Sequence, residues 1–167
     1  HHAGVITYEQ DWLNTLAQTA VNLTDPPLFL GEMARSMADQ DITIQYCTPL
    51  PSDYIASTQY PNVQTTRVSG DGFTRGGWDL FLYDSRLASA VGLWPWSDAL
   101  FHKDLGSLVI STLSAGPVGV GDAIGDVDVK NLLAVVRKDG TIIKPDTSLL
   151  PIDAVYQHDA AGEQFPM

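Results

Sequence analysis

Strand-like and helix-like segments alternate about five times along this chain, and that alternation restricts its fold more than any other feature. The strand-like runs are short and rich in β-branched and aromatic residues, at positions 5–8, 42–47, 63–68, 92–96 and 117–122. Helical character follows at positions 12–21, 27–38, 78–91, 105–113 and 129–136. This order predicts an α/β fold in which helices connect parallel strands.

Helical spacing also groups a set of apolar residues on one face of a helix. In the segment 78–91, residues of the apolar class recur three to four positions apart, at Leu80, Tyr83, Leu87 and Val91. We therefore expect these side chains to share one face of that helix.

Acidic residues follow most of the strand-like runs. Four of the five runs end within a few residues of an aspartate, at Asp11, Asp71, Asp98 and Asp122. The carboxyl ends of parallel strands face one mouth in barrels and one edge in open sheets. Carboxylates placed there are expected to converge.

The number of βα units limits the architecture. Five units are too few to close an eight-stranded barrel, so the chain is either an open sheet or a partial (β/α)8 barrel of the TIM type. An unclosed barrel exposes strand edges, which favours pairing with other strands. We therefore expect a second chain, or a homo-oligomer, to complete a barrel of this kind. A length of 167 residues is typical of a single domain.

The charge balance excludes several partners. The net charge is −11, and only nine Lys and Arg residues are spread over the chain. Without a basic cluster, nucleic acid and anionic membrane surfaces are disfavoured, whereas a neutral ligand such as a sugar fits. No apolar run is long enough to span a membrane, and no motif indicates a metal or another cofactor. Cys47 is the only cysteine, which leaves the cellular compartment open.

Several motifs are similar to those of a known enzyme family. Glu9-Gln10-Asp11 resembles the Lys-x-Asp strand end of glycoside hydrolase family 36, which contains α-galactosidases, and of the related raffinose synthases. The segment 67–71, Arg-Val-Ser-Gly-Asp, resembles the Arg-x-Ser-x-Asp segment of the same family. Further similar stretches follow in the same order, at 95–102, 116–122 and 131–145.

The resemblance implies a function and a set of site residues. It implies that residues 1–167 form a single domain, the C-terminal portion of a (β/α) barrel catalytic domain. Asp11 is then the nucleophile and Asp71 the acid/base of a retaining glycoside hydrolase acting on α-galactosides or related carbohydrates, without a cofactor or metal. The expected substrate-binding residues are Glu9, Arg67, Trp96, Asp98 and Asp122.

One departure from the family pattern keeps other functions open. The family lysine that contacts sugar hydroxyls is Glu9 here, so a donor has become an acceptor. The alternatives are a carbohydrate-binding or structural relative without catalysis, and a glycosyl-transferring enzyme of the raffinose synthase kind. Locally, Asp11 also suits a helix cap and Asp71 a turn, whereas Cys47 suits a small buried position near the mouth.

Overall fold

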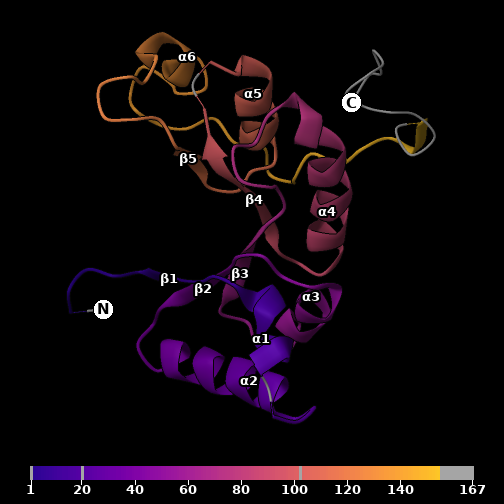
Figure 1. Cartoon of the computed structure of the whole chain (residues 1–167). Helices are drawn as coiled ribbons and strands as arrows, with labels where there is room; N and C mark the ends of the chain where they lie inside the picture. The colour runs from indigo at the N-terminus through magenta and orange to yellow at the C-terminus, as the bar shows by residue number, and fades with distance from the viewer. Residues whose placement is uncertain (1, 20, 102, 155–167) are drawn as a thin grey trace. The chain divides into compact units, whose positions relative to one another are not determined.

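The computed structural model describes residues 2–19, 21–101 and 103–154 (Figure 1). The chain forms two compact units, which are described separately below. The first unit comprises the described residues of His1–Arg67 together with Ala90–Leu93. The second unit comprises those of Val68–Ser89 and Trp94–Met167.

Three parallel strands form the sheet of the first unit, in the order β1-β2-β3. They are β1 (Thr7–Gln10), β2 (Thr43–Tyr46) and β3 (Val63–Arg67). The helices are α1 (Leu13–Thr19), α2 (Asp25–Ala38) and α3 (Pro51–Ser57), and Figure 1 shows them on one side of the strands.

Alternation along the strands decides which face of this sheet is buried. Every second residue of a strand points to the same face of the sheet. The face that carries Ile44 and Tyr46 of β2 and Thr66 of β3 is the buried one, since each of these residues is 0% exposed. α2 contacts β2 and contributes its buried residues Leu30, Met33 and Ala34 to this core. The opposite face carries the intervening residues of the three strands.

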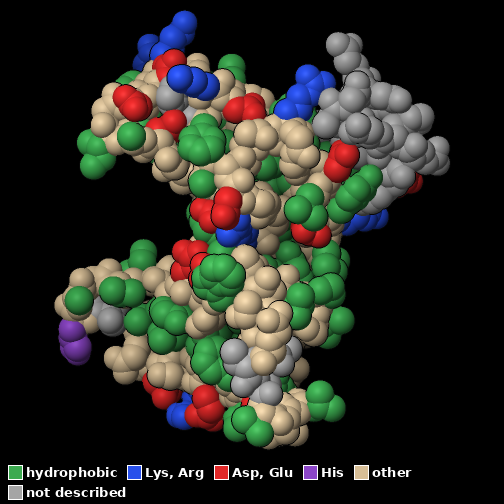
Figure 2. Space-filling view, in the orientation of Figure 1, with side chains coloured by type: hydrophobic (Ala, Val, Ile, Leu, Met, Phe, Trp, Pro, Cys, Tyr) green, Lys and Arg blue, Asp and Glu red, His purple; other side chains and the backbone are tan. Residues whose placement is uncertain are grey.

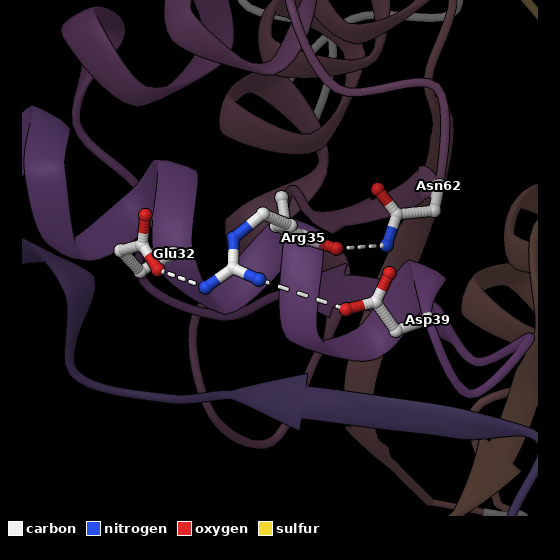
Figure 3. A network of polar contacts seen from close by, with 5 residues as sticks. Glu32, Arg35, Asp39 and Asn62 are labelled. Carbon is white, nitrogen blue, oxygen red and sulfur yellow. Dashed lines mark hydrogen bonds and ion pairs between the residues drawn. The ribbon is translucent and has the colours of Figure 1, made fainter.

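Polar contacts tie the end of α2 to the start of β3 (Figure 3). The Asn62 side-chain amide donates to the main-chain oxygen of Ala34 at 2.9 Å. On the exposed side of the helix, Arg35 pairs with Glu32 and, at 3.6 Å, with Asp39. These exposed pairs contribute little to stability, so the buried residues hold the helix in place.

The second unit contains two parallel strands, β4 (Trp94–Leu100) and β5 (Val118–Val120). Its helical elements are the short 3-10 helix η1 (Arg75–Gly77), α4 (Trp78–Ala90), α5 (Leu105–Leu113) and α6 (Val129–Leu133). The Ser97 hydroxyl of β4 bonds the Ser111 hydroxyl of α5 at 2.6 Å. On the other side of this core, the rings of Phe73 and Phe81 stack with their centroids 4.7 Å apart.

The α/β fold with parallel strands is confirmed, and five strands lie in the described residues. Two local expectations were wrong. A helix that was not predicted, α3, follows β2 directly. β4 continues to Leu100, so Asp98 lies inside the strand and not at its end. On α4, Leu80 and Tyr83 are exposed and the buried residues are Phe81, Leu82, Ser85 and Ala88.

The buried side of α4 carries Phe81, whose ring stacks on that of Phe73. His102, which ends one of the family-like motifs, lies outside the described residues.

We predict that Phe81→Ala lowers the free energy of unfolding by about 3–5 kcal/mol, because it removes a fully buried ring and leaves a cavity. The matched control is Leu80→Ala on the same helix, with 51% of the side chain exposed, which should change it by no more than about 0.5 kcal/mol. Urea unfolding followed by circular dichroism measures both. Equal losses would contradict the described face of α4.

Candidate functional site

The carboxyl ends of the three strands in the first unit bring three side chains together. Asp11 follows β1, Cys47 follows β2, and Arg67 is the last residue of β3. The parallel ladder extends past the strands, since the Cys47 N–H donates to the Gln10 carbonyl at 2.9 Å. The Arg67 guanidinium donates to the Cys47 sulfur at 3.3 Å. Asp11 and Arg67 therefore lie at the same edge of this sheet.

The Asp11 carboxylate is held in its ionised form by several neighbours. The Cys47 thiol lowers its pKa most, through a hydrogen bond. The Trp12 N–H, which donates at 2.6 Å, the charge of Arg67 and the Thr48 hydroxyl at 3.5 Å lower it further, while partial burial opposes them. A carboxylate in this setting remains charged at neutral pH, as a nucleophile requires.

The local backbone around Asp11 departs from a standard helix cap. A capping aspartate accepts from the second or third N–H of its helix, whereas Asp11 accepts from the adjacent Trp12, ahead of α1. Trp12 and Thr48 both adopt left-handed conformations, with φ of 59° and 50°. Such backbone geometry is costly for side chains of this size and concentrates at functional sites.

The surroundings of Cys47 favour a structural role over that of a nucleophile. It is 1% exposed, and burial raises the pKa of its thiol to about 12. The thiol is therefore neutral at physiological pH, whereas the thiolate is the reactive form. The expectation of a small buried residue near the mouth is confirmed. Its link between Arg67 and Asp11 was not foreseen, because no motif marks it.

In the second unit, the loop that carries Asp71 is fixed against β4. The Ser69 hydroxyl accepts a hydrogen bond from the Asp98 N–H at 2.9 Å. Gly72 has φ of +64°, and a Cβ there would lie 3.1 Å from the Phe101 ring, so other residues fit poorly. Asp71 itself is exposed within this tight bend. The expected turn setting of Asp71 is therefore present, and its side chain is exposed to solvent.

Trp96 and Asp98 share one face of β4. Alternation places them opposite Ser97, which faces α5 through its bond to Ser111. Both side chains are half-buried, and the Trp96 carbonyl accepts from the Val68 N–H at 2.9 Å. Although Asp98 does not end its strand, it lies beside an aromatic surface that suits the C–H face of a sugar ring.

A hollow of about 430 Å³ lies where β4 and β5 end. Asp122, two residues past β5, lines it as the strand-end pattern predicts. The other lining residues, which sequence reasoning missed, are Phe101, Lys103, Gly121, Ala123 and Asp126. The hollow combines a hydrogen-bond donor in Lys103, acceptors in the two aspartates and the ring of Phe101. A hollow of this size with these groups suits a small polar ligand.

The surface is acidic in keeping with the composition. Twenty Asp and Glu residues stand against nine Lys and Arg, and acidic side chains are scattered over the visible surface of each unit (Figure 2). Among the described residues, no group of three or more His, Cys, Asp or Glu side chains could hold a metal ion. None of the helices in the described part of the chain is long and apolar enough to cross a membrane.

Comparison with protein-family models, curated proteins and solved structures found no match. Glu9 lies exposed on β1, two residues before Asp11. Asp11, Glu9 and Arg67 belong to the first unit, whereas Asp71, Trp96, Asp98 and Asp122 belong to the second. The catalytic and binding roles of these residues remain predictions.

We predict that Cys47→Ala raises the pKa of Asp11, because it removes the donor that lowers this pKa most. Cys47→Ser keeps a donor and should leave the pKa close to that of the wild type. NMR titration of the Asp11 side-chain carboxyl carbon measures all three proteins. An identical titration for Cys47→Ala and wild type would contradict the described contact.

The same substitution has a consequence for acid stability. Because the folded-state pKa of Asp11 is lowered, its stabilising contribution is present above the ordinary pKa and is lost as the pH falls through the folded value. In Cys47→Ala that loss should occur at a higher pH than in Cys47→Ser.

Proposed function

We propose that this chain is part of a (β/α)8-type barrel of the glycoside hydrolase family 36 kind and catalyses retaining hydrolysis of α-galactosides or related glycosides. The observation that carries the proposal is the Asp11 carboxylate at a strand end, which accepts from the Trp12 N–H and lies beside Cys47 and Arg67. The resemblance of the motifs around Asp11 and Asp71 adds the substrate class.

In the first half of the reaction, a carboxylate oxygen of Asp11 attacks the anomeric carbon, and the bond to the leaving oxygen breaks. Asp71, in its protonated form, gives its proton to that oxygen. In the second half, Asp71 takes a proton from water, and the resulting nucleophile displaces Asp11 from the anomeric carbon. This mechanism needs the two carboxyl groups about 5–5.5 Å apart.

Different residues serve binding in this proposal. Trp96 stacks on the sugar ring, while Asp98 and Asp122 accept hydrogen bonds from its hydroxyls. Arg67 keeps Asp11 ionised through its charge. A neutral sugar is compatible with the net charge of −11, which would repel a polyanionic substrate.

A carbohydrate-binding protein without catalysis is the second candidate, and Glu9 favours it. An exposed carboxylate stands where the family places a lysine that donates to sugar hydroxyls. Sugar binding is then retained in a changed orientation, and turnover is lost. Transfer to a sugar acceptor in place of water shares the covalent intermediate and remains a variant of the first proposal.

We also propose that further strands pair with the outer edge of β1. In the described residues β1 pairs with β2 alone, and Val5 and Ile6 just ahead of it are 46% and 70% exposed. An edge of this kind is a template for another strand. A second chain, or a second copy of this one, fits as its source.

We predict that Asp11→Asn and Asp71→Asn each lower kcat on aryl α-galactosides by at least about 100-fold, because each removes a carboxyl group that forms or breaks a bond. The matched control is Asp41→Asn, at the amino end of β2, where the left-handed φ of 55° also suits asparagine. Its kcat should equal that of the wild type.

A chromogenic assay over a panel of aryl α- and β-glycosides provides the measurement. If the folded wild-type protein turns over none of them, the hydrolase proposal is wrong. Sugar binding without turnover would then identify the second candidate.

A further inference from the structure

The helix-free face of the sheet in the first unit carries an ordered series of polar side chains. Alternation places Thr7 and Glu9 of β1 on this face together with Thr43, Gln45 and Thr65 of the neighbouring strands. The hydroxyls of Thr7 and Thr43 bond each other at 2.8 Å. The Thr65 hydroxyl donates to the Gln45 side-chain oxygen at 3.1 Å.

Register orders these side chains into rows across the strands. Glu9, Gln45 and Thr65 are partners in one row. The next row toward the strand ends contains Asp11, Cys47 and Arg67, two residues further along each strand. Two residues of a strand span roughly 6.6 Å, which is about the reach of one pyranose ring with its hydroxyls.

Gln45 has hydrogen-bonding capacity that the described residues do not use. Its side chain is 8% exposed overall, and its oxygen accepts from Thr65. Within residues 2–19, 21–101 and 103–154, its amide nitrogen donates to no other group. The bond to Thr65 fixes the orientation of the amide and directs the nitrogen away from β3.

Glu9 supplies the complementary group on the adjacent strand. It is the register partner of Gln45, it is exposed, and it forms no hydrogen bond or ion pair with any described residue. The Glu9 carboxylate only accepts, and the Gln45 amide nitrogen only donates, yet no bond joins them. A hydroxyl group is the ligand group that can donate to the first and accept from the second.

We propose that Gln45 is a specificity-determining residue, which with Glu9 binds ring hydroxyls of a neutral sugar whose anomeric carbon lies at Asp11. This inference rests on the proposed function and names the ligand groups that the site contacts. It also accounts for Glu9 in place of the family lysine. The donor has moved to the neighbouring strand, and the acceptor now comes from β1.

A purely structural role for Gln45 makes a different prediction. In that case Gln45 contributes only its bond to Thr65. Replacing Gln45 then lowers the stability of the fold without changing how the protein discriminates between sugars. The test therefore uses Gln45→Leu and Gln45→Glu, the second of which keeps the oxygen that accepts from Thr65 and removes both N–H donors. Gln64→Leu, at an exposed position next to Thr65 where the β2–β3 register is irregular, is the matched control.

The experiment measures kcat and KM for 4-nitrophenyl α-galactoside and for its 2-, 3-, 4- and 6-deoxy analogues. Calorimetry measures the affinity of free galactose in parallel. We expect Gln45→Leu and Gln45→Glu to raise KM and weaken galactose binding by roughly tenfold, with a smaller change in kcat, while Gln64→Leu matches the wild type. For at least one deoxy analogue, the difference between wild type and the Gln45 variants should vanish.

The outcomes separate this inference from the proposed function. If the wild type hydrolyses the galactoside and both Gln45 variants keep its KM for every analogue, the inference is overturned and the hydrolase proposal stands. If galactose binding depends on Gln45 but no turnover occurs, the inference stands and the hydrolase proposal fails. If the folded wild type neither binds nor hydrolyses these sugars, both are overturned.

Discussion

The contact of Arg67, Cys47 and Asp11 across three parallel strands is the interaction on which the site depends. It exists because β1, β2 and β3 run in the same direction and in register, so that residues just past each strand meet at one edge. The cation acts on Asp11 partly through its charge and partly through a buried thiol. The chain as a whole is strongly acidic, yet this arrangement places the positive charge of Arg67 near the Asp11 carboxylate and favours its charged form.

The alternation of segment types was sufficient to predict the α/β fold and the parallel direction of the strands. Short β-branched runs and helical spacing are local properties, and tertiary contacts did not override them at β2, β3 or α5. The errors arose where contacts between elements, and not local sequence, determine the structure. On the buried side of α4 the Phe81 ring stacks on Phe73, and β4 continues through Asp98, whose N–H donates to the Ser69 hydroxyl.

The candidate site was also predictable only in part, because some of its residues are identified by their position along the chain and others only by their neighbours in the fold. The strand-end pattern identified Asp11 and Asp122, which follow β1 and β5, whereas Arg67 was named from the family-like motif. Three features were not predictable: Cys47 as a donor to Asp11, Gln45 with an amide nitrogen that donates to no described residue, and Lys103 in the hollow of the second unit. Their roles depend on which side chains are neighbours across strands, and spacing along one chain does not contain that information.

Covalent trapping tests the central claim most directly, namely that the Asp11 carboxylate is the group that attacks an anomeric carbon. The folded protein is incubated with 5-fluoro-α-galactosyl fluoride, from which a nucleophile displaces fluoride to form a slowly hydrolysed glycosyl ester. Digestion and tandem mass spectrometry then locate the added sugar. The account predicts one ester on Asp11, absent in Asp11→Asn; an adduct on another residue, or none despite turnover of the parent galactoside, would contradict it.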